Sequence, residues 1–153
     1  MGPDGKIIFN ESLLNQLGLT EDEIKIQIKK TMDVIKKRNQ LFRGARPFPP
    51  LNDKIVIVAD DGLASGYTML AAIKFIKRAS PQKIIVAVPT GSKRTVDFIL
   101  SESDELVCLN VRTGFIFAVA DAYRKWHDLT DKEVVDIINK FKENTKSRGG
   151  PAG

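Results

Sequence analysis

Hydrophobic and polar positions along the chain follow two periods, which predict an alternating series of strands and helices. Short runs of aliphatic residues, such as Ile55–Val58 and Lys83–Val88, have the length and β-branched character of buried strands. Other segments repeat apolar residues every three to four positions, which is typical of helices that pack by one face. The alternation predicts an α/β domain with a Rossmann-like parallel sheet flanked by helices.

The expected elements can be placed along the chain from this pattern. Two pairs, Thr20 with Glu23 and Thr130 with Glu133, have the spacing of capping boxes and mark helix starts. We expect one domain over residues 1–144 and a disordered tail over 145–153. The predicted strands are 6–9, 55–58, 83–88 and 106–109; the predicted helices are 12–17, 21–42, 69–78, 94–100 and one beginning at 131; residues 113–120 fit a strand or a loop, and 121–126 a helical turn.

The segment after the strand at Ile55–Val58 carries the most informative chemistry. Asp60 and Asp61 follow this strand, which we expect to be buried on both faces, and a small-residue loop over 64–68 precedes a helical pattern. Ligands bind at the carboxyl ends of parallel strands, and the N–H groups at a helix start bind phosphate. Two carboxylates repel phosphate, but they accept hydrogen bonds from hydroxyls. The pattern therefore predicts a ribose 5-phosphate site, with an ordinary capped turn as the alternative.

These residues resemble the signature of the type I phosphoribosyltransferases, in which an apolar strand, two acids and two variable residues precede a Thr/Ser-Gly loop. The match runs from Val58 to Thr68, and segments 87–89, 104–109 and 117–123 resemble a subgroup with Asp-Asp-Gly-Leu-Ala in this position. The resemblance implies the type I phosphoribosyltransferase fold and a site for phosphoribosyl pyrophosphate or a nucleotide. The implied substrate-binding residues are Asp60, Asp61, Gly62, Leu63, Ala64, Ser65, Gly66, Tyr67 and Thr68, and no catalytic residue is assigned.

The resemblance also has departures that bear on activity. Ala64 stands where 6-oxopurine salvage members carry an acid, which disfavours hypoxanthine or guanine as the acceptor. Only a turn precedes Lys6–Phe9, so the family's N-terminal part, with its pyrophosphate loop, is expected to be missing. The basic glycine motifs at 43–46 and 148–150 do not follow a buried strand, and we interpret them as a connector and a tail.

Three interpretations of activity follow from these departures. The first is transfer of the phosphoribosyl group to a nitrogenous base, with Mg²⁺ carried by the pyrophosphate. The second is a noncatalytic nucleotide-binding remnant of the family. The third is a chain whose missing part is supplied by another polypeptide. Members of the family are commonly dimers, so a homodimer is expected.

Composition and charge add a rival interpretation. The 153 residues are 42% hydrophobic, and no segment is apolar enough to span a bilayer, so we expect a cytoplasmic protein without a membrane partner. A net charge of +5 suits anionic ligands and also suggests a nucleic-acid-binding function through the basic helix from Lys25 to Arg46. Asp33 interrupts that charge and no aromatic residues are interleaved with it, so this is the weaker alternative.

A few single residues complete the candidates. Cys108 is the one cysteine and His127 the one histidine, so neither a disulfide nor a metal cluster is expected. Phe115 and Phe117 are candidates for stacking on a base, although core packing is the more common role of such residues. Tyr67, in the phosphate loop, is the better exposed candidate.

Overall fold

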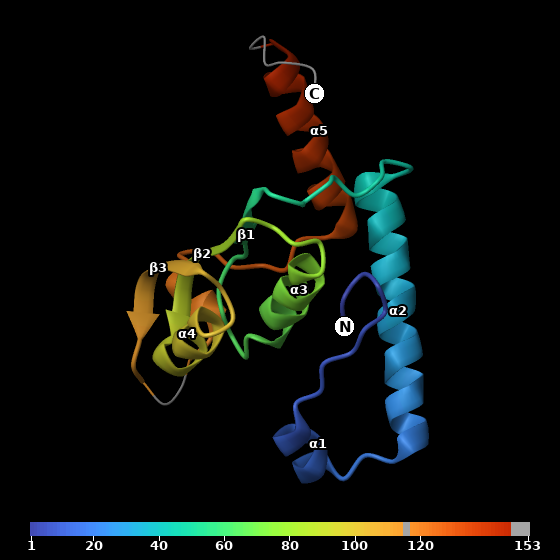
Figure 1. The fold of residues 1–153 in the computed structure, drawn as a ribbon, viewed down its shortest axis with the longest axis vertical. Helices are drawn as coiled ribbons and strands as arrows, with labels where there is room; N and C mark the ends of the chain where they lie inside the picture. Colours follow the sequence, from blue (N-terminus) through green and yellow to red (C-terminus); the bar gives the residue numbers. More distant parts are fainter. Residues whose placement is uncertain (115–116, 148–153) are drawn as a thin grey trace.

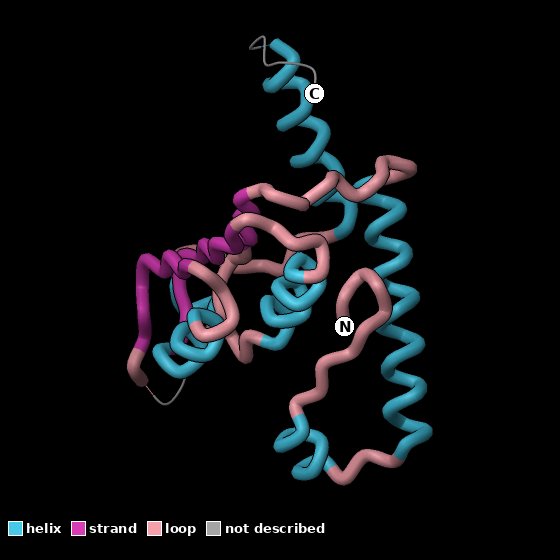
Figure 2. Tube along the Cα trace, viewed as in Figure 1, coloured by secondary structure: helices cyan, strands magenta, loops and turns pink. Residues whose placement is uncertain are grey.

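The computed structural model describes residues 1–114 and 117–147, and its centre is a parallel sheet (Figures 1 and 2). The three strands are β1 (Ile55–Ala59), β2 (Lys83–Ser92) and β3 (Glu105–Arg112), in the order β1-β2-β3. Helix α3 (Tyr67–Lys77) connects β1 to β2, and α4 (Lys93–Leu100) connects β2 to β3. The predicted α/β fold with a parallel sheet is confirmed.

The core lies between the sheet and these two helices. Because each strand pairs beside the previous one and parallel crossovers are right-handed, α3 and α4 cover the same face of the sheet. Alternate residues of β2 point into this layer and are almost fully buried. The buried hydrophobic residues are Leu63, Met69, Leu70, Ala71, Ile73, Ile76, Ile84, Val86, Val88, Val96 and Ile99.

The remaining helices lie outside this layer (Figure 1). They are α1 (Glu11–Leu17), α2 (Glu21–Arg43), the short 3-10 helix η1 (Val119–Ala122) and α5 (Asp131–Ser147). Helix α2 runs beside the sheet and its helices, and α5 projects beyond them. No helix in the described ranges is long and apolar enough to cross a membrane.

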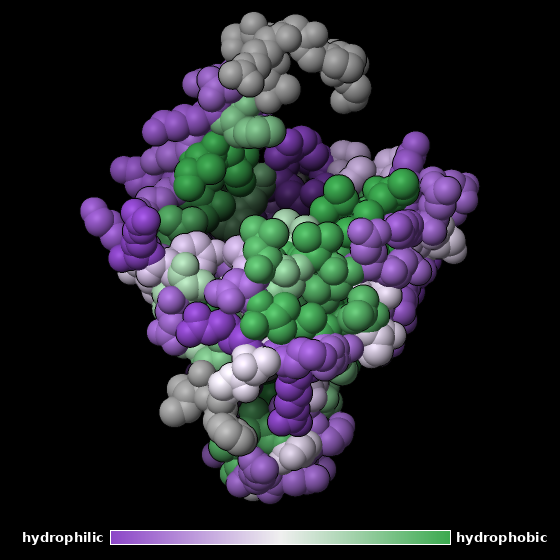
Figure 3. Space-filling model, turned by 90° about the vertical axis from the view of Figure 1, so that its left-hand side faces the viewer, coloured by the Kyte–Doolittle hydropathy of each residue, from purple (hydrophilic) through white to green (hydrophobic). Residues whose placement is uncertain are grey.

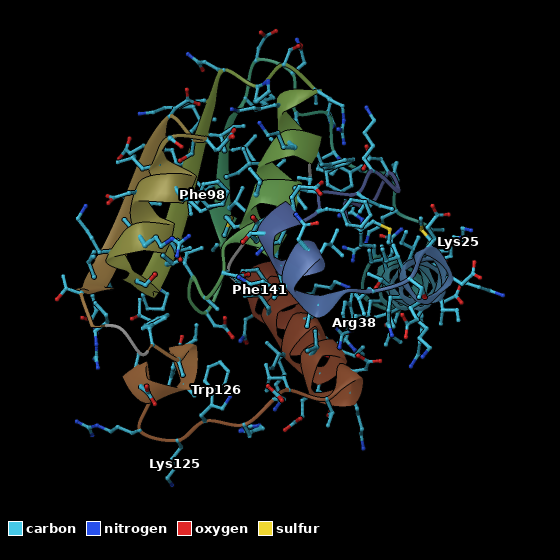
Figure 4. All side chains as sticks on the ribbon, turned by 90° about the horizontal axis from the view of Figure 1, so that it is seen from below. Lys25, Arg38, Phe98, Lys125, Trp126 and Phe141 are labelled. Carbon is cyan, nitrogen blue, oxygen red and sulfur yellow. The ribbon has the colours of Figure 1, made fainter. Side chains whose placement is uncertain are left out.

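Ion pairs join α2 to α5 at the start of α5. Lys37 and Arg38 each approach Asp131 at 3.2 Å, and hydrogen bonding and charge from these two cations lower the pKa of Asp131. Arg38 is labelled near the first turns of α5 in Figure 4. Both predicted capping boxes form, with Glu23 and Glu133 accepting hydrogen bonds from the backbone N–H groups of Thr20 and Thr130 at 2.8 Å.

The structure corrects several predicted boundaries. Residues Lys6–Phe9 are not a strand; Ile8 packs against the core, but the segment does not pair with the sheet. Strand β2 continues to Ser92, beyond the predicted end at Val88, because Thr90, Gly91 and Ser92 pair with β3. In place of the helical turn expected at 121–126, the structure has η1 at Val119–Ala122. Helix α5 continues to Ser147, beyond residue 145, where the tail was expected to begin. Residues 148–153 lie outside the described residues.

Strand β1 is not buried on both faces, which corrects a further expectation. Val56 and Val58 pack against the core, whereas Ile55 and Ile57 are 58% and 65% exposed on the opposite face. The physical cause is the shared direction of the two crossovers, since both connecting helices cover the same side of the sheet.

The start of α3 depends on a glycine packed against α4. Gly66 has φ of 81°, a left-handed conformation that favours glycine. A Cβ at this position would lie 2.8 Å from Cγ2 of Thr95 and 3.3 Å from Cδ1 of Ile99. Two constraints therefore act on Gly66, the backbone angle and the close approach of α4.

Replacing Gly66 by alanine tests both constraints. We expect Gly66→Ala to lower the free energy of unfolding by about 2–3 kcal/mol, because backbone strain and a steric clash add. Gly18→Ala is the matched control, since Gly18 has φ of 58° with nothing within 4 Å of the added Cβ. That control should lose only about 1 kcal/mol. Urea unfolding measures both, and equal losses would mean that contact with α4 adds nothing.

Candidate functional site

The predicted site residues gather around a hollow at the carboxyl end of β1. The hollow measures about 110 Å³ and lies between the end of the strand and the first turn of α3. Its lining residues are Asp60, Gly62, Leu63, Ala64, Ser65, Gly66, Thr68 and Met69. Asp61 and Tyr67, which the sequence also suggests, are not among them. Seven of the nine predicted binding residues therefore share one cavity.

Asp60 and Asp61 are exposed at the carboxyl end of β1. The backbone N–H of Asp61 donates to Oδ1 of Asp60 at 3.0 Å, and the N–H of Asp60 donates to the carbonyl of Ala87 on β2 at 3.4 Å. Partial burial raises the pKa of Asp60, and the negative charge of Asp61 adds to that rise. The pair thus offers carboxylate oxygens to a ligand, and Asp60 binds a proton more readily than an ordinary aspartate.

The loop before α3 offers the complementary chemistry. Gly66 caps α3 without a side-chain hydrogen bond, and the first helical bond is the N–H of Leu70 to the carbonyl of Gly66, at 2.8 Å. The N–H groups of the first turn therefore have no partner within the helix. Ser65 and Thr68 are exposed and add two hydroxyls beside them. Such a helix start attracts an anionic group.

The end of β2 and the start of α4 hold this loop in place. The N–H of Leu63 donates to the carbonyl of Thr90 at 2.9 Å, and Oγ1 of Thr95 donates to the carbonyl of Ala64 at 2.7 Å. Ser92 donates to Thr95 at 2.9 Å and completes the chain of bonds. Residues 89–92 do not line the hollow. They fix the loop that does.

A second support for the site, which no sequence pattern indicated, comes from η1 and the residues after it. The hydroxyl of Tyr123 donates to the carbonyl of Asp61 at 2.7 Å. A Cβ at Gly62 would lie 2.7 Å from Cγ1 of Val119, so only glycine allows this approach. Tyr123 also packs on Trp126, with ring centroids 5.0 Å apart. The contacts of Tyr123 with Asp61 and of Val119 with Gly62 join segments about sixty positions apart in the sequence, and no local pattern predicts them.

Most of the other residues that the sequence singled out contact neighbouring parts of the protein. The ring of Tyr67 lies 6.0 Å from that of Phe98 on α4, so it packs against α4. Cys108 is half-buried against the core, and His127 pairs with Glu133 at 3.3 Å near the start of α5. Phe117 is half-buried, and Phe115 lies outside the described residues.

Comparisons with known proteins give the family. The model of the phosphoribosyl transferase domain matches residues 3–126. The chain is 30% identical over 140 residues to MT0597 and to Rv0571c, two proteins of Mycobacterium tuberculosis strains that are named as candidate phosphoribosyl transferases. The match covers 92% of this chain and 31% of each relative, so the chain spans about a third of their length.

A solved structure shows the same arrangement. The crystal structure of TT1426 from Thermus thermophilus has a TM-score of 0.69 and 26% sequence identity to this chain. The likeness covers 92% of this chain and 65% of that one. Together, the family model over residues 3–126, the parallel sheet and the acid-and-glycine segment after β1 lead to one conclusion. The chain belongs to the phosphoribosyl transferase domain family.

Proposed function

We propose that the hollow after β1 binds the 5-phosphoribosyl group of phosphoribosyl pyrophosphate or of a nucleoside 5′-monophosphate. The observation that carries this proposal is that one cavity is lined by two kinds of group: the carboxylate of Asp60, with Asp61 next to it in the chain, and an uncapped helix start. A ligand that joins neutral hydroxyls to a phosphate matches both. Membership of the phosphoribosyl transferase domain family supports the same ligand.

In this proposal each part of the site has one role. Asp60 and Asp61 accept hydrogen bonds from the ribose hydroxyls, and the N–H groups at the start of α3 donate to the 5-phosphate. Ser65 and Thr68 add hydroxyl donors to that phosphate. Thr95 and Tyr123 act as positioning residues, because each bonds a backbone carbonyl of the segment that carries the binding groups.

We further propose that the bound phosphoribosyl group can be transferred. A ring nitrogen of the acceptor base would form a bond to C1 of the ribose and release its proton to water, and the bond from C1 to the pyrophosphate oxygen would break, with both electrons leaving on pyrophosphate. No group of three or more His, Cys, Asp or Glu side chains in the described ranges could hold a metal ion. The pyrophosphate itself would carry Mg²⁺, which is usually bound through substrate phosphates and water with few protein ligands.

Bound in that way, Mg²⁺ would neutralise the charge that develops on the departing pyrophosphate. The residues of this chain would meanwhile hold the ribose by Asp60 and Asp61 and fix its phosphate at the start of α3. Holding the ribose at both ends presents C1 to an incoming base in a constant orientation.

A second candidate function is nucleotide binding without turnover. The specific observation is that none of the residues lining the hollow is basic. Departure of pyrophosphate needs positive or hydrogen-bond-donating groups around the leaving oxygens. The lining provides such donors for one phosphate group, at the start of α3.

Neutralising the two acids tests the binding proposal. We expect the double variant Asp60→Asn, Asp61→Asn to bind ribose 5-phosphate at least about tenfold more weakly in calorimetry, because hydrogen bonds to charged acceptors are lost. Asp33→Asn on α2 removes one exposed carboxylate elsewhere and should bind like the native chain. Thermal melting should show all three proteins folded. Unchanged affinity in the double variant would place the ligand elsewhere.

The raised pKa of Asp60 predicts a pH dependence. The ligand needs the carboxylate form, so affinity for ribose 5-phosphate should fall as the pH decreases through the pKa of Asp60, which lies above its usual 3.8. The phosphate itself also gains a proton at about pH 6. The affinity of the Asp60→Asn variant should still fall when the phosphate gains its proton, but it should lack the second fall, at the pKa of Asp60. Identical pH profiles for the two proteins would contradict a role for the Asp60 carboxylate.

Transfer is tested by pyrophosphate release. We expect the native chain with phosphoribosyl pyrophosphate and Mg²⁺ to release pyrophosphate only when an acceptor base is added, across a panel of purines and pyrimidines. The double variant at Asp60 and Asp61 should reduce the rate. Binding of phosphoribosyl pyrophosphate without release for any base would favour the second candidate function.

A further inference from the structure

An aromatic pair, Tyr123 and Trp126, lies beside the acidic end of the candidate site. The hydroxyl of Tyr123 donates to the carbonyl of Asp61 at 2.7 Å, and the two rings lie 5.0 Å apart with 57° between their planes. The two residues are 38% and 40% exposed. Each ring is therefore held by a contact within the fold and still presents part of its surface to a ligand.

The two ends of the site are joined to different elements. At the end that leads into α3, Oγ1 of Thr95 on α4 donates to the carbonyl of Ala64 at 2.7 Å. At the other end, the segment with the two acids is bonded to Tyr123 through the carbonyl of Asp61. The aromatic pair is thus anchored at the end with the acids, and α4 at the end with the helix start. Hydrophobic surface is widespread on one side of the molecule (Figure 3), so it is this anchoring, and not exposure alone, that distinguishes the pair.

The covalent structure of a nucleotide determines where its base lies in such a site. In a nucleoside 5′-monophosphate the base is attached to C1 of the ribose, which is bonded directly to C2 and its hydroxyl. The phosphate is attached on the other side of the sugar ring, through C4 and C5. With the hydroxyls on Asp60 and Asp61 and the phosphate at the start of α3, the base lies beside the acids. That is the end of the site at which Tyr123 is anchored.

The chemistry of the two rings suits a base. Every nucleobase has a flat π-face that stacks on aromatic side chains, and this contact does not read the hydrogen-bonding pattern of the base. Because the planes of the two rings are 57° apart, a base that lies flat on one of them meets the other at an edge. The bond to Asp61 fixes the ring of Tyr123 before a ligand arrives, which lowers the entropy lost on binding.

The aromatic residues that the sequence suggested are placed less well for this role. The ring of Tyr67 lies 6.0 Å from that of Phe98 on α4, at the end of the site with the helix start. Phe117 is half-buried. In Figure 4 the side chains of Lys125 and Trp126 leave the connector on opposite sides, and Lys125 points away from the rest of the molecule. The connector thus directs Trp126 toward the body of the protein.

We propose, on the basis of the function proposed above, that Tyr123 and Trp126 form the stacking surface for the base of a bound nucleoside 5′-monophosphate. Stacking of a base on an aromatic side chain strengthens binding by about five- to a hundredfold. Because the gain grows with the apolar area that is removed from water, a purine nucleotide binds more tightly than a pyrimidine nucleotide, and both bind more tightly than ribose 5-phosphate.

Calorimetry with ligands that have and lack a base tests this proposal. We expect the native chain to bind adenosine 5′-monophosphate at least about fivefold more tightly than ribose 5-phosphate, with uridine 5′-monophosphate between them. Trp126→Leu should lose most of this difference, whereas Trp126→Phe, which keeps an aromatic ring, should retain most of it. Phe48→Leu is the matched control, because Phe48 is 48% exposed and lines a separate hollow, and it should bind like the native chain.

Comparison of the two ligands separates stacking from a structural role. If Trp126 only supported Tyr123 and the segment with the acids, Trp126→Leu would weaken the binding of both ligands by the same factor, and this would overturn the proposal. Equal affinity of the native chain for both ligands would also overturn it, while the ribose 5-phosphate site would stand. Binding of neither ligand would contradict the proposed function as well.

Fluorescence tests contact between the base and Trp126 directly, because Trp126 is the one tryptophan of the chain. The emission is excited at the red edge of tryptophan absorption, where adenine does not absorb. We expect adenosine 5′-monophosphate to change the emission saturably, over the concentration range found by calorimetry, and ribose 5-phosphate to leave it unchanged. Unchanged emission with the nucleotide bound would contradict the placement of its base against Trp126.

Discussion

The shared handedness of two crossovers is the constraint on which the rest of this structure depends. With strands in the order β1-β2-β3, right-handed connections place α3 and α4 together on one face. That single layer buries the core and brings α4 against the start of α3, where Gly66 leaves room for Thr95 and Ile99. The same arrangement leaves the second face of the sheet open.

The backbone of the candidate site is held mainly by hydrogen bonds from neighbouring elements of this layer, and less by contacts among the site's own residues. The loop before α3 is exposed, yet its backbone is bonded to the end of β2 through Thr90 and to α4 through Thr95. Tyr123 and Val119 hold the segment with the two acids from the other side. The hollow is thereby lined both by Asp60 at the strand end and by residues at the start of α3. In the proposed binding mode the ligand's hydroxyls face the acids and its phosphate meets the helix start.

Much of this could be predicted from local sequence, because the signals are short. The strand, the two acids and the glycine before α3 lie within a few residues of one another, and both capping boxes are read from pairs three positions apart. The predictions fail where contacts between residues far apart in the sequence determine the structure. Lys6–Phe9 has a strand-like pattern but no pairing partner, whereas Pro89–Ser92 extends β2 because β3 lies beside it. Burial of Ile55 and Ile57 could not be judged without the strand order, and Tyr123 is joined to Asp61 only by the fold. The domain limits and the roles of the binding residues stay predictions.

The central claim is that one hollow holds a ribose by its hydroxyls and its phosphate by a helix start. The most direct test is a titration of ribose 5-phosphate into the ¹⁵N-labelled chain, followed by backbone amide NMR. The account predicts that the largest shifts fall on two separate groups, residues 65–68 at the start of α3 and Asp60 with Asp61 at the strand end, and that inorganic phosphate shifts only the first group. Shifts confined to the basic surface of α2, or no saturable shifts at residues 60–68, would contradict it.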